Sequence, residues 1–264
     1  MKRFLILLFL LFFPLLACSY GTIPSDNNVY KNWGNSSVER FDQSRLRILV
    51  WNILKAKREG FKEDFFNLSN EYDLILLQEF ISDNFIEKFW NSLTAFRADY
   101  AVSFIRNGQS TGVATLSRAP IKSSSWIRSV PREPITGTPK MIIINNYEFG
   151  SHDLLVANIH GINFVSTYNF QQQLNQLKNA IKLHDGPMIV AGDFNTWNEN
   201  RMKILDKMCD RLKLTRVSFP GRYKYNTSEL DHILVRGLVV KNQRVLSNIT
   251  TSDHFPLSIE LSSK

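Results

Sequence analysis

Cysteine is scarce in this sequence: Cys18 and Cys209 are the only two in 264 residues. Such a low number excludes a small secreted fold held together by disulfides. Cys209 follows Leu205 and Met208 at helical spacing, which predicts a thiol that packs as a small apolar side chain. The fold must therefore depend on an apolar core, and a hydrophobic content of 44% suffices for one large α/β domain.

Internal repeats, low-complexity stretches and a second change in composition are also missing after residue 45. We therefore expect one domain over residues 45–264. Acidic residues are fewer than basic ones, 24 against 32, which gives a net charge of +8 and a pI near 9.5. This excess indicates an anionic partner such as nucleic acid or phospholipid headgroups, although a basic surface without a specific role is the alternative.

A long apolar run occurs only at the N-terminus. Lys2 and Arg3 precede the apolar run Phe4–Ala17, and Cys18 follows it. This order is typical of a secretory signal, and the run is short for a membrane span. The four residues ending at Cys18, Leu-Leu-Ala-Cys, resemble the lipobox of bacterial lipoproteins. We therefore expect a signal peptide over residues 1–17 and a lipid on Cys18.

This N-terminus predicts a lipoprotein of the bacterial cell envelope, anchored to a membrane and facing the periplasm or lying in the outer membrane. Ser19 after the cysteine favours outer-membrane sorting. The alternative is an ordinary cleaved signal and a secreted protein. Residues 18–44 are polar and rich in Asn, Ser and Asp. We expect them to tether the lipid to the domain.

Several short apolar runs of strand length are bounded by polar residues. Some of these runs end on a polar residue, and two others directly follow the polar pairs Asp231-His232 and Asp253-His254. Because the start of a strand lies beside the end of its antiparallel neighbour, we expect all these positions to line one rim. The runs that end on a polar residue stop at Asn52, Glu79, His160 and Asp193.

Amphipathic helices are predicted after Asn52, after Glu79, after His160 and over 200–212. Between the second and third helices the sequence is extended at 100–105, 112–117, 123–128 and 140–144, which indicates antiparallel pairing. Two mixed, mostly antiparallel sheets packed face to face, with helices outside, account for this pattern.

The sharpest motif is Gly192-Asp193-Phe194-Asn195. Asp193 and Asn195 point the same way if the segment is extended. A carboxylate activates water, and an amide orients an oxyanion without adding charge. The alternative is a turn closed by Asx hydrogen bonds.

Asn52 and Glu79 have the oxygen donors that Mg²⁺ prefers. A buried carboxylate at Glu79 needs a cationic partner, which is a metal ion or, alternatively, a Lys or Arg. Asp231 and His254 form a plausible carboxylate–imidazole pair, in which the carboxylate fixes the tautomer and raises the basicity of the ring. Asp253 precedes a strand, where a bend would let it reach the metal.

A series of motifs occurs in order over residues 46–261. The motifs are Val50–Asn52, Leu77–Glu79, Gly112–Arg118, Asn158–His160, Gly192–Asn195, Leu230–Ile233 and Ser252–Leu257. Together they resemble the endonuclease/exonuclease/phosphatase superfamily, which includes pancreatic-type DNases, repair nucleases, neutral sphingomyelinases and inositol-polyphosphate phosphatases. The stretches Val50–Ile53, Asn163-Phe164 and Gly192–Trp197 resemble most its bacterial YafD-like branch.

The resemblance implies a DNase I-like four-layer α/β sandwich and a metal-dependent phosphodiesterase. It implies Mg²⁺ or Mn²⁺ held mainly by Glu79, with Asn52 and Asp253 nearby. It further implies that Asp193 orients or deprotonates the attacking water, that Asn195 contacts the phosphate and that His254, supported by Asp231, acts on the phosphate or the water. His160 would clamp the phosphate or stabilise the leaving oxygen. Residues 109–111 lack the glutamate that supports this histidine in pancreatic-type DNases.

Three substrate classes remain open. Nucleic acid comes first, because Lys55, Lys57, Arg58, Arg118, Arg128 and Arg132 would contact its backbone if they surround the rim. A phospholipid substrate is the second, with Trp126, Phe164 and Trp197 as candidates for contact with a bilayer. A surface lipoprotein without catalysis is the third. We expect a monomer.

Overall fold

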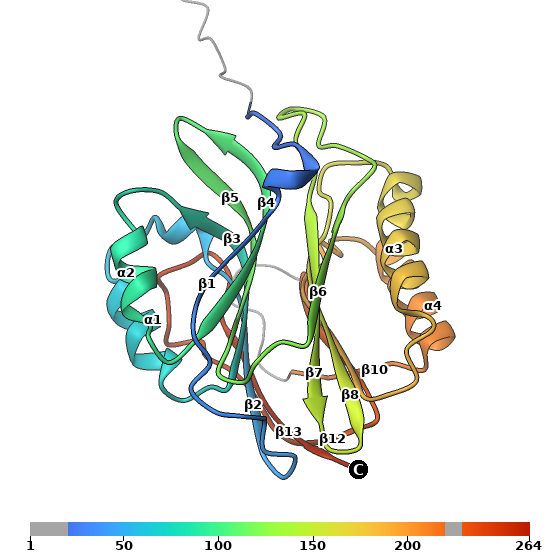
Figure 1. The fold of residues 1–264 in the computed structure, drawn as a ribbon. Helices are drawn as coiled ribbons and strands as arrows, with labels where there is room; N and C mark the ends of the chain where they lie inside the picture. The colour runs from blue at the N-terminus through green and yellow to red at the C-terminus, as the bar shows by residue number, and fades with distance from the viewer. Residues whose placement is uncertain (1–20, 220–228) are drawn as a thin grey trace, which may run out of the picture.

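We describe a computed structural model of the chain over residues 21–219 and 229–264. The predicted signal peptide and Cys18 lie outside the described residues. Figure 1 shows two β-sheets face to face, with α1 and α2 on one side and α3 and α4 on the other. This is the predicted four-layer sandwich of two mixed sheets with helices outside, so the predicted fold class is confirmed.

The first sheet has seven strands in the order β1-β4-β5-β3-β2-β13-β12. β2 and β3 run parallel, and the other neighbours are antiparallel. In sheet order the strands are β1 Tyr30–Gly34, β4 Arg97–Arg106, β5 Gln109–Ser117, β3 Leu74–Ser82, β2 Leu46–Asn52, β13 Leu257–Ser263 and β12 Leu238–Val245.

The second sheet has six strands in the order β10-β11-β9-β8-β7-β6. β8 and β9 are its parallel pair. In sheet order the strands are β10 Thr215–Arg216, β11 Asp231–Arg236, β9 Met188–Asp193, β8 His152–His160, β7 Met141–Phe149 and β6 Ser123–Arg128. The helix-free stretch between residues 100 and 144 thus forms antiparallel strands, as predicted.

The helices cover the outer faces of the sheets because each has one apolar stripe. α1 (Phe61–Ser69) and α2 (Glu87–Ser92) pack on the first sheet, and α3 (Thr167–Ile181) and α4 (Glu199–Leu212) pack on the second. A third apolar cluster fills the space between the sheets. Short 3-10 turns, η1 at Asp26–Asn28 and η2 at Leu54–Ala56, complete the order of elements.

Strand direction determines which loops share an end of the sandwich. β2, β3, β8 and β9 all end where β5, β7 and β11 begin. The loops at this end therefore lie together, and we call it the site end. In Figure 1 the chain approaches β1 from the same end, and the C-terminus lies at the opposite end.

The segment from residue 21 to 44 differs from the tether expected over residues 18–44. Its strand β1 pairs with β4, and Val29 and Phe41 are buried. The polar composition hid these apolar anchors because they are isolated in sequence. Every described helix and strand lies downstream of residue 21.

No helix in the described ranges is long and apolar enough to cross a membrane. Cys209 is buried in α4 as a free thiol, as its spacing predicted.

Candidate active site

The predicted rim assembles at the site end through strand register. His160 at the end of β8 lies opposite Asp193 at the end of β9, and Asp193 in turn lies opposite Asp231 at the start of β11. Asn52 ends β2 in the other sheet and lies beside Gln78 of β3. Because the sheets face each other, the two sets of strand ends meet over the top of the shared core.

Asp193 is the centre of the cluster, and its side chain is almost completely buried. Its Oδ2 atom accepts a hydrogen bond from Asn52 Nδ2 at 3.0 Å and lies 3.6 Å from His160 Nε2 and 3.9 Å from His254 Nε2. Burial raises the pKa of Asp193 to about 6, against the lowering effect of His254. The carboxylate is therefore a base with a pKa close to neutral pH.

The turn after β9 differs from the extended segment that we expected. Asn195 is in the left-handed region at φ 54°, and its backbone N–H donates to Asp193 Oδ1 at 2.9 Å. Its side-chain Nδ2 donates to the carbonyl of Gly161. The motif is thus an Asx turn that also presents both polar residues to one cavity. Gly192 is required because a Cβ there would lie 2.0 Å from the carbonyl of Ile159.

His254 lies between two carboxylates. Its Nδ1 atom is 2.9 Å from Asp231 Oδ2, while Nε2 faces Asp193. Burial alone would lower the pKa of His254, but Asp231 and Asp193 outweigh it and raise this pKa to about 10. The ring therefore carries a positive charge at neutral pH, and Asp231 fixes its orientation.

His160 has the opposite electrostatic environment. The ring is fully buried, and burial followed by the positive charges of Lys140, His254 and Lys55 holds its pKa well below the usual range. A neutral His160 can donate one hydrogen bond and accept another. It is not an imidazolium, so it is unsuited to act as a strong general acid.

Glu79 projects from a β-bulge within β3, where its φ is 50°, and the strand continues beyond the expected end at Glu79 to Ser82. Its Oε2 atom is buried, lies 3.0 Å from Lys55 Nζ and accepts no hydrogen bond from the described residues. Burial acts to raise the pKa of Glu79, and Lys55 and Lys140 more than offset it, so this pKa is lowered. A buried ionised carboxylate that faces a cation fits the oxygen-rich donor set preferred by Mg²⁺.

A cavity of about 320 Å³ joins these groups. The predicted residues that line it are Asn52, Glu79, His160, Asp193, Asn195, Asp253 and His254, while Asp231 supports His254 from behind. Asp253 is exposed in the bend before β13, which begins at Leu257 and later than we expected.

Two basic lining residues, Arg106 and Lys140, were not predicted from the sequence as site residues. Lys140 directly precedes β7, whose start lies beside the end of β8 at His160. The rule that identified Asp231, a polar residue at the start of an antiparallel strand, would also have identified Lys140.

The predicted phosphate-binding cations are only partly gathered at the cavity. Lys55 lines it, whereas Arg118 lies at the opposite end of β5 and donates to the carbonyl of Tyr72. The guanidinium group of Arg58 donates to the backbone carbonyl of Thr250, and that of Arg128 donates to the backbone carbonyl of Pro24. Of these four residues, only Lys55 lines the cavity.

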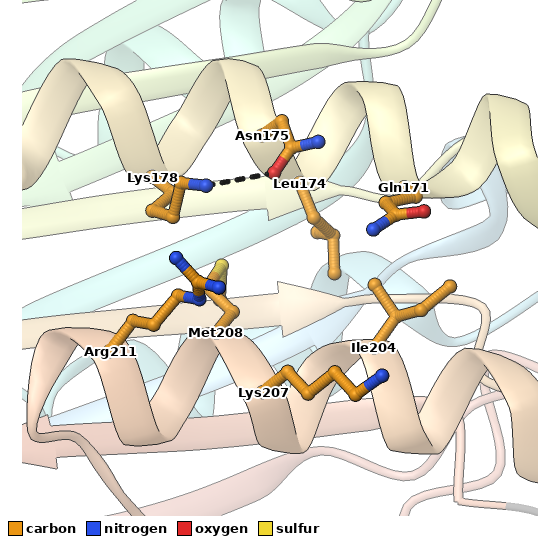
Figure 2. A pocket seen from close by; sticks show the side chains of 8 residues that line it. All are labelled: Gln171, Leu174, Asn175, Lys178, Ile204, Lys207, Met208 and Arg211. Carbon is orange, nitrogen blue, oxygen red and sulfur yellow. Dashed lines mark hydrogen bonds between the residues drawn. The ribbon is translucent and has the colours of Figure 1, made fainter.

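A second depression of about 330 Å³ lies between α3 and α4. Figure 2 shows Lys178 directed to Asn175 along α3, while Lys207 and Arg211 extend along α4. Among its lining residues there is no carboxylate, histidine or hydroxyl group. The reactive groups are instead concentrated in the cavity at the site end.

The chain is similar to known proteins in sequence and in fold. The UPF0294 protein of Vibrio campbellii is 33% identical over 227 residues, which cover 81% of this chain and 76% of that protein. A Bacteroides vulgatus structure described as an endonuclease/exonuclease/phosphatase superposes with a TM-score of 0.67 at 15% identity, over 84% of this chain and 100% of that one. Sphingomyelinase C from Streptomyces griseocarneus superposes with a TM-score of 0.60 at 14% identity, over 82% of this chain and 99% of that one.

The profile of the Endonuclease/Exonuclease/phosphatase family matches residues 49–254, which contain every predicted site residue from Asn52 to His254. The chain therefore belongs to the endonuclease/exonuclease/phosphatase family.

Proposed function

We propose that this chain is a divalent-metal-dependent phosphodiester hydrolase in which water attacks phosphorus in line. The observation that carries the proposal is the buried Asp193 carboxylate, held by Asn52 and faced by His160 and His254 in one cavity. Family membership supports hydrolysis of phosphoester bonds.

Glu79, with Asn52 and Asp253, would hold Mg²⁺ or Mn²⁺. The bound cation would neutralise charge that develops on the phosphoryl oxygens. In this structure the ammonium of Lys55 faces the Glu79 carboxylate. When a cation occupies that carboxylate, the ammonium would be free to approach a phosphoryl oxygen.

The protein side chains transfer the proton and stabilise the charge that develops during the reaction. Asp193 orients the attacking water and takes its proton as the new P–O bond forms and the bond to the leaving oxygen breaks. The imidazolium of His254 stabilises negative charge on the phosphoryl group, and Asp231 holds that ring in place. Neutral His160 and the Asn195 side chain position the phosphate through hydrogen bonds.

Nucleic acid is the first substrate candidate. The net charge of +8 favours a polyanion, and Lys55, Arg106 and Lys140 place positive charge at the cavity. These contacts recognise phosphate groups without reading a base.

A phospholipid is the second candidate, and a specific observation favours it. Large apolar side chains are exposed on the loops around the cavity, among them Ile135 and Phe164. Such side chains suit a lipid surface better than a charged polymer.

The test is hydrolysis by wild type and Asp193→Asn of a panel containing plasmid DNA, RNA and phospholipid vesicles, each with Mg²⁺, Mn²⁺ or a chelator. Asp185→Asn, an exposed carboxylate at the opposite end, is the matched control. We expect metal-dependent cleavage of one substrate class that falls at least about 100-fold in Asp193→Asn and not in Asp185→Asn. Cleavage that survives in Asp193→Asn, or cleavage of no substrate, would contradict the proposal.

We also propose that the mature chain begins at a lipid-modified Cys18 and lies on an envelope membrane of a bacterium. The sequence pattern of residues 1–18 supports this. The mass of the mature N-terminal peptide tests it, because acyl chains on Cys18 add a characteristic mass, whereas an ordinary cleaved signal leaves none.

A further inference from the structure

Exposed apolar side chains gather at the site end. On most soluble proteins such side chains are scattered singly, and a group of them marks an interaction surface. The group is Phe85 (88% exposed), Val130 (71%), Ile135 (81%), Phe164 (68%), Tyr168 (67%) and Trp197 (44%), and we call it the apolar rim.

Topology brings these residues together, although they are far apart in sequence. Phe85 follows the end of β3, and Val130 and Ile135 lie in the loop that leads from β6 to the start of β7. Phe164 and Trp197 follow the ends of β8 and β9. Phe164 lines the cavity, and the other residues of the apolar rim lie in segments at the same end of the sandwich.

The remaining exposed apolar side chains lie elsewhere. Val38 follows the far end of β1, and Val239 lies near the far start of β12. Phe66 is on the outer face of α1. Leu183, 85% exposed, follows the C-terminal end of α3 at the end opposite the cavity. The apolar rim is thus a local feature, and Leu183 is an equally exposed reference position.

Asn163 bonds to two of the rim's aromatic residues. Asn163 Oδ1 accepts from the backbone N–H of Phe164 at 2.9 Å and from Trp197 Nε1 at 3.0 Å. Phe164 itself is kept at φ 54°, a left-handed conformation that is unfavourable for a residue with a bulky side chain. The fold thus keeps the backbone of Phe164 in a strained conformation while its side chain is 68% exposed.

The N-terminal chain reaches the domain at the same end. The backbone N–H and C=O groups of Thr22 each bond to Ile105 near the end of β4, at 2.8 Å. Gly21 lies against the ring of Phe104, which lines the cavity. Gly21 and Thr22 therefore lie at the site end.

Exposed cations accompany the rim. Lys57 follows η2 after the end of β2, and Arg132 lies between Val130 and Ile135. Apolar side chains interleaved with basic ones suit the boundary between acyl chains and anionic headgroups.

From these observations we propose that the site end docks on an anionic lipid surface, with the apolar rim in the headgroup layer and the cavity opening toward the lipid phosphates. Docking needs no hydrolysis. The further step, that lipid phosphodiesters enter the cavity, rests on the proposed function.

Vesicle flotation tests docking with a chain that begins at Ser19 and so keeps every described element without the apolar N-terminal run. The vesicles are phosphatidylglycerol with phosphatidylethanolamine, or phosphatidylcholine alone. We compare wild type, Val130→Ser/Ile135→Ser and the control Leu183→Ser. Loss of two inserted side chains should weaken binding to the anionic vesicles about tenfold or more, while Leu183→Ser binds as wild type does. Phosphatidylcholine should bind less than the anionic mixture.

Equal loss in the rim variant and Leu183→Ser, or no vesicle binding by wild type, would overturn the docking proposal. Hydrolysis of a small soluble diester, bis(p-nitrophenyl) phosphate, is measured in parallel to separate the two proposals. Vesicle binding without hydrolysis of this diester would support the docking proposal and contradict the proposed function. Hydrolysis of this diester without vesicle binding would support the proposed function and contradict the docking proposal.

Discussion

Residues in the left-handed region of backbone space cluster at the cavity. Leu54, Lys55 and Ala56 follow one another at φ between 47° and 56°, and Glu79 and Asn195 adopt the same region. Each such conformation costs about 1 kcal/mol or more in a residue with a side chain. The surrounding fold maintains this strain, and its result is to direct Lys55 and Glu79 at each other.

Lys55 would compete with the proposed divalent cation for the Glu79 carboxylate. We expect Lys55→Met to bind Mn²⁺ several-fold more tightly than wild type, because the site no longer has to displace an ammonium 3.0 Å from the carboxylate. Isothermal titration without substrate measures this. Lys57→Met removes the same charge from an exposed position two residues away and should change the affinity by less than about twofold. Weaker Mn²⁺ binding in Lys55→Met would argue against competition.

The charge on His254 couples this cluster to stability. Its pKa is about 10 in the folded chain and 6.5 as an unperturbed group, so between these values the folded state binds more protons than the unfolded state. The stabilisation is complete below pH 6.5 and is lost as the pH rises toward 10. We therefore expect the difference in Tm between wild type and His254→Gln, measured by circular dichroism with a chelator, to shrink over this interval. A constant difference would mean that the ring is not charged.

At the scale of elements, α4 positions the loops that follow β8 and β9. Arg201 of α4 is completely buried, and its guanidinium donates to the carbonyls of Ile162, Asn195 and Val165. The group also stacks near the rings of Phe170 and Trp197, and burial lowers its pKa to about 10. One side chain thus ties together two loops from different strands.

Removing this tie should loosen both loops. We expect Arg201→Met to lower the free energy of unfolding by about 3 kcal/mol, because buried carbonyls lose their donors. Urea denaturation measures the change, and the same variant should lose hydrolysis by more than its unfolded fraction explains. Arg211→Met, an exposed residue of the same helix, is the control and should stay within about 0.5 kcal/mol of wild type. Equal effects of the two substitutions would show that the buried contacts carry no special energy.

At the scale of the whole molecule, the site exists because two sheets are fixed relative to each other. Apolar packing between them is reinforced by buried amides. Gln78 of β3 donates to Asn158 Oδ1 of β8 at 2.7 Å, and Asn158 Nδ2 donates to the carbonyl of Ala114 in β5 at 2.9 Å. These bonds lie one or two residues from the site residues Glu79 and His160, so they set the distance across the cavity.

Asn158→Leu should therefore affect stability and geometry together. The substitution leaves the carbonyls of Leu77 and Ala114 and the amide of Gln78 without their buried partner, and we expect a loss of about 2–4 kcal/mol in urea denaturation. Asn242→Leu, at an exposed position of the edge strand β12, should change stability by less than about 0.5 kcal/mol. A stable Asn158→Leu variant would show that apolar packing alone aligns the sheets.

The periodicity of the sequence predicted most elements correctly because each strand or helix buries one continuous apolar pattern. The strands ending at Asn52 and Asp193 and the helix over 200–212 follow directly from it, whereas β3 continues past the expected end at Glu79 to Ser82. Strand β1 escaped prediction, since Tyr30–Gly34 has no such pattern and forms because β4 offers it an edge. The YafD-like branch and the lipid on Cys18 stay predictions.

The sequence by itself determined the chemistry of the site, because the residue types that activate water or hold a cation stand at the ends of apolar runs. The tertiary structure decided what those groups experience. Burial raises the pKa of Asp193, two carboxylates keep His254 charged, and strained turns bring Lys55 to Glu79. It also decided which exposed apolar residues share the site end. Such properties depend on distances between segments that are remote in the chain, and these distances are set only when the two sheets pack.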